Sequence, residues 1–264
     1  NPTTEHFWDK TCITPGTNFM NKLNKQIKSF FNKHKLNIDN IIISGSDEPG
    51  EGEHKLFEYI RNNKEYHKDK NTVIYGLDAD LIMLSINHLP ISKNIYLFRE
   101  TPEFIKQLDN NLDANKLYMI DIPTLASRVS FELNQGAQVE SNIINNKIYD
   151  YILLCFFLGN DFMPHFPALN IRTNGIQILM EAYASLFTDT EDFLVDKQEI
   201  IWKNIRKLIS SLATNEEEYI IEEYLSRNKQ EKHFIKANTP EEKLDKLNRI
   251  PTFERHEEHY INPT

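Results

Sequence analysis

The stretch "NTVIYGLDADLIMLS", from Asn71 to Ser85, decides the fold class of this chain. The residues from Val73 to Tyr75 are mostly β-branched or aromatic, a composition typical of a short buried strand. A turn containing glycine and two aspartates follows, and an apolar helical pattern begins at about Leu81. The stretch therefore predicts a strand, a turn and a helix, in that order.

The same order occurs earlier in the chain. "NIIIS", from Asn40 to Ser44, predicts a second buried strand, and an acidic turn and an amphipathic helical pattern follow it. Two more strands are predicted at residues 94–100 and 116–122, and helices at residues 18–36, 54–63 and 123–133. Alternating strands and helices predict an α/β fold with a mostly parallel sheet flanked by helices. Ligands of such sheets bind beyond the carboxyl ends of the strands, where the acidic turns are expected to lie.

We expect the chain to have three parts. Residues 1–133 carry the strand and helix patterns of an α/β core. Residues 134–146, "NQGAQVESNIINN", are polar and are predicted to be a linker or a mobile insertion. Residues 147–264 repeat apolar helical patterns, beginning with "KIYDYILLCFFLG", and are predicted to be a helical segment.

Composition narrows the class of protein. The 264 residues are 40% hydrophobic and 26% charged, which is typical of a soluble globular protein. A formal net charge of -9 argues against a protein that holds nucleic acid only through a broad basic surface, but it is compatible with a nuclease. Cys12 and Cys155 lack the spacing of a zinc site and indicate a reducing, intracellular compartment. No apolar run is long enough to predict a membrane span.

The first acidic turn lies in "SGSDEPGEGEHKLFEYIR", residues 44–61, and contains Asp47, Glu48, Glu51 and Glu53. One interpretation is helix capping, because acidic residues in a first helical turn complement the helix dipole by about 0.3–1 kcal/mol each. The glycines on both sides of Glu51 favour another interpretation, since they let the backbone aim Glu51 and Glu53 at one point. Asp47 and Glu48 precede a proline and are expected to serve the turn.

Two further acidic turns follow apolar elements. "GLDADL" holds Asp78 and Asp80 at a predicted strand end, although capping of the next helix by Asp80 is an alternative. "LGNDFMPHFP" holds Asp161 after the apolar run "ILLCFFLG". An aspartate at the carboxyl end of a buried helix is unfavourable without a cation, because the carbonyl groups there already carry negative partial charge. The three turns together suggest one shared site.

Carboxylates that gather in one place repel one another unless a cation lies between them. Oxygen ligands without cysteine select a hard ion, Mg²⁺ or Mn²⁺. Mg²⁺ takes few protein ligands, so five carboxylates fit two ions better than one. Two such ions, about 3.5–4 Å apart, support phosphodiester hydrolysis. The residues therefore predict a metal-dependent nuclease or phosphatase.

The segments "CITPGTNFM", "PGEGEHKLFEYIR", "YGLDADLIML" and "LCFFLGNDFMPHFPALNIR" occur in this order. In combination they resemble the catalytic region of the eukaryotic 5′→3′ exoribonucleases, the Xrn family. The resemblance implies a PIN-like, flap-endonuclease-type core followed by a helical segment. It also implies hydrolysis of single-stranded RNA that carries a 5′ monophosphate, one nucleotide at a time.

By the same resemblance, the metal ligands and catalytic residues are Glu51, Glu53, Asp78, Asp80 and Asp161. The two glutamates serve the first ion, Glu53 bridges, and the three aspartates serve the second ion. The family's N-terminal portion, which supplies further aspartates and a 5′-phosphate pocket, has no match in this chain. We therefore expect a fragment of the catalytic region with weak or no activity alone, located in the cytoplasm or, less favoured, the nucleus.

Two other classes of protein stay open. A structure-specific flap or 5′ DNA nuclease would share the acidic turns, but a helix-hairpin-helix is expected after its second aspartate pair, where this chain has strand patterns. A non-catalytic RNA-binding scaffold would be expected to lose carboxylates, and all five are present.

Several neighbouring residues have two interpretations each. His54 and His165 either orient a ligand or make structural hydrogen bonds. Lys55 and Arg172 either contact RNA phosphates or lie at solvated or salt-bridged positions. Asn160 either positions Asp161 through a hydrogen bond or ends the preceding helix.

Overall fold

The computed structural model describes residues 8–34, 36–99, 112–113, 116–136, 141–171, 173–188, 192–196, 199–234, 239–240 and 242–243. The chain divides into two compact units. The first comprises Asn1–Asn71 with Ile91–Lys93, and the second comprises Thr72–Pro90 with Asn94–Thr264.

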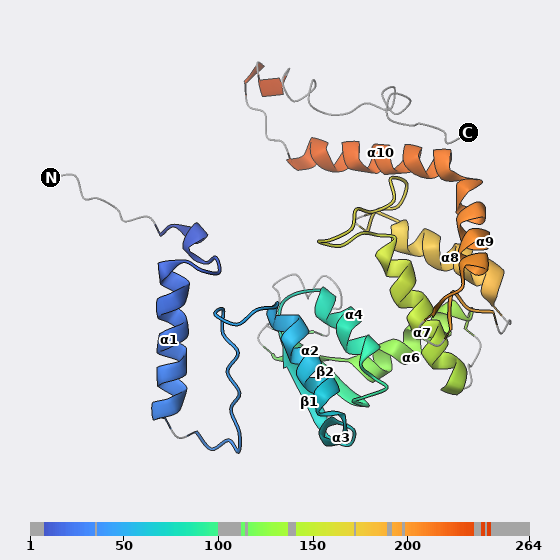
Figure 1. Cartoon of the computed structure of the whole chain (residues 1–264). Coiled ribbons are helices and arrows are strands. Elements are labelled where there is room, and N and C mark those ends of the chain that lie inside the picture. The colour runs from blue at the N-terminus through green and yellow to red at the C-terminus, as the bar shows by residue number, and fades with distance from the viewer. Residues whose placement is uncertain are drawn as a thin grey trace. The chain divides into compact units, whose positions relative to one another are not determined.

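The first unit contains the short helix η1 (Lys10–Cys12), α1 (Asn18–Lys33), α2 (Gly52–Asn62) and α3 (Lys64–His67), drawn in blue to cyan in Figure 1. α1 begins where predicted, because the hydroxyl oxygen of Thr17 accepts a hydrogen bond from the Met20 N–H at 3.3 Å. α2 follows the first acidic turn, also as predicted, and buries Phe57 and Ile60. Helical periodicity thus predicted both long helices of this unit.

The strand predicted at Asn40–Ser44 is wrong. The structure has neither helix nor strand there, and the Ile42 side chain is 61% exposed. A β-branched run favours a pleated surface only where a neighbouring strand completes the ladder, and that neighbour is a property of the tertiary fold.

The second unit contains a three-stranded sheet of β1 (Asn71–Tyr75, which begins at the last residue of the first unit), β2 (Asn94–Arg99) and β3 (Tyr118–Asp121), in the order β1-β2-β3. α4 (Asp80–Asn87) joins β1 to β2, and α6 (Ile122–Leu133) follows β3. The strand predictions near residues 73, 94 and 116 are confirmed, as is the α/β class.

The mostly parallel arrangement is not confirmed, because β2 and β3 are antiparallel, with Tyr96 opposite Asp121. The sheet is small and mixed. A strand's hydrophobic pattern is the same in both directions, so the pattern predicted the strands but not their orientation.

The rest of the second unit is helical, as predicted. It contains α7 (Ser141–Phe156), α8 (Gly175–Phe187), α9 (Trp202–Ala213) and α10 (Glu216–Phe234), with the small antiparallel pair of β4 (Val195–Asp196) and β5 (Glu199–Ile200) before α9. A hydrophobic core joins α6 to α7, α8 and α9, and its buried members are Leu133, Leu154, Leu158, Leu169, Leu179, Tyr183, Phe187, Leu194, Ile205 and Leu208. None of the helices in the described part of the chain is both long and apolar enough to cross a membrane.

α7 begins inside the predicted linker. Residues 134–136 form a turn in which Gln135 and Gly136 have positive φ values of 51° and 83°, and the helix starts at Ser141. The polar composition of 134–146 predicted a linker or mobile insertion, but a polar stretch can be helical when an apolar pattern continues the same helix.

Candidate metal centre

The first acidic turn presents Glu51 without using it as a helix cap. Glu51 occupies the N-cap position of α2, with φ -74° and ψ 148°, but its side chain makes no capping hydrogen bond. The side chain is 63% exposed, and its Oε2 lies 3.6 Å from Nε2 of His54. Glu53 follows in the first turn of α2. Glu51 thus makes no capping hydrogen bond, but its carboxylate lies at the N-terminal end of α2, where it complements the helix dipole, so the dipole interpretation stays open beside the metal-ligand one.

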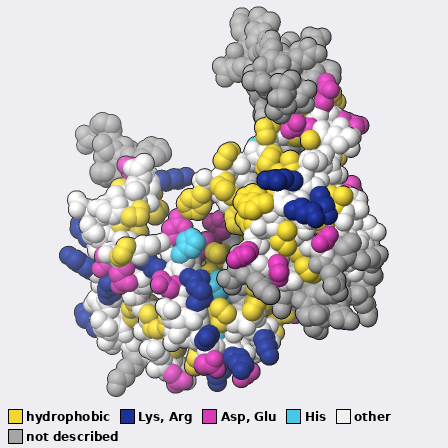
Figure 2. All heavy atoms as spheres, turned by 45° about the vertical axis from the view of Figure 1, so that its right-hand side comes forward, with side chains coloured by type: hydrophobic (Ala, Val, Ile, Leu, Met, Phe, Trp, Pro, Cys, Tyr) yellow, Lys and Arg dark blue, Asp and Glu magenta, His cyan; other side chains and the backbone are white. Residues whose placement is uncertain are grey.

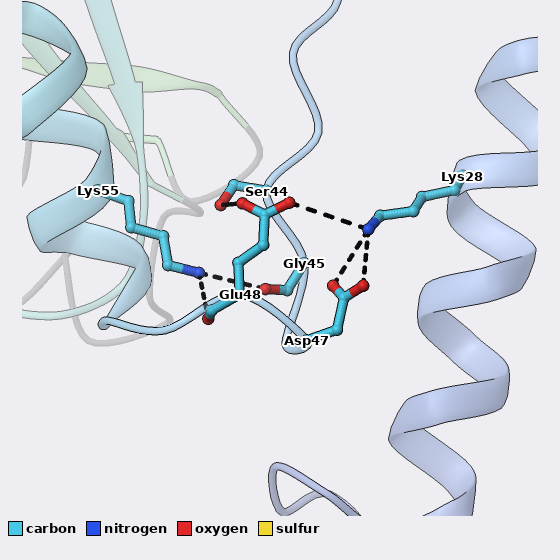
Figure 3. A network of polar contacts seen from close by, with 6 residues as sticks. All are labelled: Lys28, Ser44, Gly45, Asp47, Glu48 and Lys55. Atoms are coloured by element: carbon cyan, nitrogen blue, oxygen red, sulfur yellow. Dashed lines mark hydrogen bonds and ion pairs between the residues drawn. The ribbon is translucent and has the colours of Figure 1, made fainter.

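Asp47 and Glu48 have different partners from Glu51. Lys28 Nζ, on α1, donates to Asp47 Oδ2 at 2.9 Å and to Oδ1 at 3.1 Å, and lies 3.9 Å from Glu48 Oε1 (Figure 3). Ser44 Oγ donates to Glu48 Oε2 at 2.6 Å. The hydrogen bond from Lys28, followed by one from Asn24, lowers the pKa of Asp47. These two carboxylates serve the turn, as expected.

Lys55 also binds this turn. Its Nζ donates to the carbonyl oxygen of Glu48 at 2.9 Å and to that of Gly45 at 3.2 Å (Figure 3). Neither interpretation from the sequence, a phosphate contact or a salt bridge, described these backbone contacts. Arg172, its counterpart in those interpretations, lies outside the described residues.

The second acidic turn joins β1 to α4. The Asp80 N–H donates to Asp78 Oδ1 at 3.3 Å, and the N-cap position is taken by Ala79 rather than by Asp80. Asp80 is the first helical residue, so its side chain does not fill the capping role that was the alternative. Both carboxylates are exposed on one short turn anchored by buried Ile74 and Leu81.

The third acidic turn holds Asp161 in a tightly bonded loop after α7. The side-chain oxygen of Asn160 accepts from the N–H groups of Phe162 at 2.9 Å and Met163 at 2.8 Å. The Asn160 N–H donates to the Met163 carbonyl at 2.9 Å. α7 has already ended at Phe156, so Asn160 shapes the loop that carries the exposed Asp161 rather than ending the helix. His165 has a structural contact, with Nδ1 2.7 Å from the Phe166 carbonyl oxygen.

The predicted ligands divide between the two units. Glu51 and Glu53 belong to the first unit, and Asp78, Asp80 and Asp161 belong to the second. Among the residues that the structure describes, no three aspartate, glutamate, histidine or cysteine side chains form a group that could hold an ion. The donor chemistry fits a hard divalent ion, since all five predicted ligands are carboxylates. The gathering of all five around two ions stays a prediction.

A buried aspartate in the helical segment was not identified from the sequence. Asp150, on α7, is fully buried and accepts hydrogen bonds from Tyr183 Oη at 2.6 Å, the Leu194 N–H at 2.9 Å and the Val195 N–H at 2.8 Å. Burial raises its pKa to about 6. Lys147, one turn earlier, donates to the Phe187 carbonyl at 2.7 Å. The signal was present, because a charged residue inside "KIYDYILLCFFLG" needs a buried partner.

Known proteins match the chain in two segments. The family model described as "XRN 5'-3' exonuclease N-terminus" matches residues 1–101, and the model described as "Xrn1 helical domain" matches residues 142–260. The chain belongs to the Xrn family. The first segment contains the glutamate pair and the first two aspartates of the candidate site, and the second segment contains Asp161.

Individual Xrn relatives agree with this assignment. The 5'-3' exoribonuclease 1 of Schizosaccharomyces pombe is 32% identical over 228 residues, 81% of this chain and 17% of the relative. The 5'-3' exoribonuclease 2 of Arabidopsis thaliana is 30% identical over 249 residues, 79% of this chain and 24% of the relative. That of Eremothecium gossypii is 29% identical over 272 residues, 92% of this chain and 29% of the relative. The chain therefore spans less than a third of the length of these Xrn proteins.

Among the described residues, the face shown in Figure 2 carries no broad basic patch, in agreement with the acidic composition of the sequence. On the face that Figure 2 displays, the described Lys and Arg side chains lie among acidic and hydrophobic ones. A net charge of -9 likewise argues against a broad basic field over the chain.

Proposed function

We propose that this chain is part of the catalytic region of a metal-dependent 5′→3′ exoribonuclease that hydrolyses single-stranded RNA with a 5′ monophosphate. The observation that carries the proposal is the Xrn match in both segments, which include all five predicted ligands. The relatives are named 5'-3' exoribonucleases, which supports the polarity and the RNA substrate. The 5′-monophosphate preference rests on the resemblance of the motifs.

Two Mg²⁺ or Mn²⁺ ions are the proposed cofactors. Glu51 and Glu53 would hold the first ion, and Asp78, Asp80 and Asp161 the second. Bound there, the ions would supply an activated water and stabilisation of the leaving oxygen. The described structure supports this role because the side chains of Asp78, Asp80 and Asp161 are exposed on short turns, where a cation can reach them.

The turns are also shaped for a fixed geometry. Asp78 and Asp80 share one turn at the end of β1, and the Asn160 side chain holds the backbone around Asp161. Carboxylates on short, hydrogen-bonded turns lose little conformational freedom when they bind an ion. Because the chain spans less than a third of the length of these Xrn proteins, it is proposed to be weakly active or inactive alone.

The test uses the natural full-length protein and a 3′-labelled RNA with either a 5′ monophosphate or a 5′ triphosphate. We expect Mg²⁺-dependent release of nucleoside monophosphates from the monophosphorylated RNA, at a rate lowered at least about 100-fold by Asp80→Asn. Asp69→Asn, the same change at an exposed aspartate outside the acidic turns, serves as the control and should leave the rate unchanged.

Three outcomes would contradict the proposal. Hydrolysis that needs no divalent ion, or whose rate is unchanged by Asp80→Asn, would contradict the proposed metal-dependent mechanism. Preferential cleavage of a DNA flap would favour the structure-specific nuclease. RNA binding without hydrolysis would favour the non-catalytic scaffold.

A further inference from the structure

We propose that Lys55 is a positioning residue that fixes the first acidic turn so that Glu51 and Glu53 are held ready for a metal ion. This inference rests on the proposed function, because it assigns a role to a residue that supports the proposed ligands. Lys55 itself touches neither substrate nor ion in this proposal.

Lys55 joins the turn to α2 through both its backbone and its side chain. Its N–H donates to the Glu51 carbonyl at 3.1 Å, which is the first hydrogen bond of the helix. Its Nζ returns to the Glu48 carbonyl at 2.9 Å and the Gly45 carbonyl at 3.2 Å (Figure 3). We call these two Nζ contacts the Lys55 clamp. The clamp closes the segment from Gly45 to Lys55, which contains both Glu51 and Glu53.

The clamp acts where the backbone is otherwise free to move. Gly50 has φ +96° and Gly52 has no neighbour within 4 Å of the position of a Cβ, so glycines of high conformational freedom flank Glu51 on both sides. The side chain of Lys55 runs beside Gly50, since a Cβ there would lie 3.6 Å from Lys55 Cε and 3.7 Å from Cγ. Glu51 itself makes no capping bond, so the clamp restrains a glycine-flanked segment that the Glu51 side chain does not fix.

Lys28 and Lys55 both bind the first part of this turn, which carries Asp47 and Glu48. Lys28 reaches the carboxylates of Asp47 and Glu48 from α1, and Lys55 reaches the carbonyl groups of the same turn from α2, as Figure 3 shows. Glu48 links both, through its side chain to Lys28 and through its carbonyl to Lys55. Both cations therefore act on the first half of the turn, whereas Glu51 lies beside His54 and is exposed to solvent.

The contacts favour positioning over RNA binding for Lys55. An ammonium group has three donors, and two of them are used by carbonyl oxygens of the turn. A lysine that binds phosphate as a point charge keeps its head group open to the ligand. Loss of the clamp should therefore change the affinity for metal more than the affinity for RNA.

The experiment compares Lys55→Met with Lys55→Arg in the natural full-length protein. Methionine keeps much of the length of the side chain but removes the donors, and arginine keeps the charge and the donors. Lys64→Met, at an exposed position on α3, is the matched control. Three quantities are measured: the Mn²⁺ concentration for half-maximal hydrolysis, the binding of Mn²⁺ by calorimetry without RNA, and the hydrogen exchange of the amides from residue 46 to residue 53.

For Lys55→Met we expect a 5- to 20-fold rise in the Mn²⁺ concentration for half-maximal hydrolysis, a matching loss in calorimetric affinity, and faster exchange from residue 46 to residue 53. At saturating Mn²⁺ the KM for RNA should change less than twofold. Lys55→Arg should recover at least half of the loss on a logarithmic scale, and Lys64→Met should behave as the wild type. These results would distinguish a fixed ligand turn from a general loss of stability.

A rise in the KM for RNA at unchanged metal dependence would overturn the inference in favour of a phosphate contact, and unchanged exchange and unchanged metal affinity would overturn it entirely. If Lys55→Met does not fold, Lys55→Arg tests the inference by itself. Arginine cannot reproduce both carbonyl contacts unaltered, so this variant should show a smaller rise in the required Mn²⁺ concentration and a smaller increase in amide exchange from residue 46 to residue 53. Failure of the proposed function has a different signature. The wild type would then lack Mn²⁺-dependent hydrolysis, while the exchange experiment would still report on the clamp.

Discussion

Removal of one hydroxyl group from the helical core should lower its stability by an amount that depends on pH. Tyr183 donates to Asp150 Oδ2 at 2.6 Å, and both residues are fully buried. Tyr183→Phe removes this donor and leaves a buried carboxylate oxygen without it. A hydrogen bond to a charged group contributes about 1.5–3 kcal/mol, so we expect local stability to fall by about that amount at pH 8.

The pH dependence follows from the sign of the pKa shift. In the folded wild type the pKa of Asp150 is raised by burial from 3.8 to about 6. A raised pKa means that the folded state binds the proton more tightly than the unfolded state. Protonated Asp150 therefore contributes to the free energy of unfolding, and this contribution is fully present below about pH 4 and is lost as the pH rises through about 6. At about 1.4 kcal/mol per pH unit, the difference between 3.8 and 6 corresponds to about 3 kcal/mol.

Tyr183→Phe removes a contact that favours the charged carboxylate, so it should raise the pKa of Asp150 further. The loss of stability should therefore be large at pH 8 and small at pH 5, where the carboxyl group is protonated. Native-state hydrogen exchange of the α7 and α8 amides measures this local stability, with exchange rates corrected for pH. Tyr66→Phe, at a side chain that is 64% exposed, is the control. Equal losses at pH 5 and pH 8, or no loss at either, would refute the reasoning.

Two further changes test the loop that carries Asp161. Gly159→Ala should destabilise the loop by about 1–2 kcal/mol because its φ is +79°, and by about 1–3 kcal/mol more because a Cβ would lie 2.7 Å from the His165 backbone nitrogen. Thermal unfolding should show a larger loss of stability than for Gly16→Ala, where φ is +88° but a Cβ would meet open space. Equal losses for the two variants would contradict the steric contribution. Asn160→Ala removes the acceptor of two loop N–H groups and should lower the rate of metal-dependent hydrolysis about 10-fold, as measured with the full-length protein, whereas Asn160→Asp keeps an acceptor and should lose less.

Local pattern predicted those parts of the fold that local interactions determine. α1 and α6 follow apolar periodicity, and the helical segment was predicted from the same signal. The strand at Asn40–Ser44 failed because a strand needs a partner that its own residues do not encode. The antiparallel pairing of β2 with β3 was missed for a related reason, since orientation is decided between segments rather than within them.

The acidic turns were predictable, whereas their role as one site stays a prediction. Carboxylates beside glycines and after apolar runs are visible in the sequence, and the structure places Asp78 with Asp80 on one turn and exposes Asp161. The contacts of Lys55 were not predictable, because they depend on a side chain that folds back over a glycine to reach backbone carbonyls. The gathering of all five carboxylates stays a prediction, because they belong to two separate units.

Counting charges is therefore a poor guide to which acidic residues bind a metal. Asp47, Glu48, Glu51 and Glu53 crowd one turn, and composition alone treats them alike. Their partners separate them: Asp47 and Glu48 face a lysine from another helix, whereas Glu51 makes no side-chain capping bond and lies exposed beside a histidine. A carboxylate already neutralised by a lysine would have to exchange that partner for the ion. Within this turn the contacts therefore favour Glu51 as a ligand over Asp47 and Glu48.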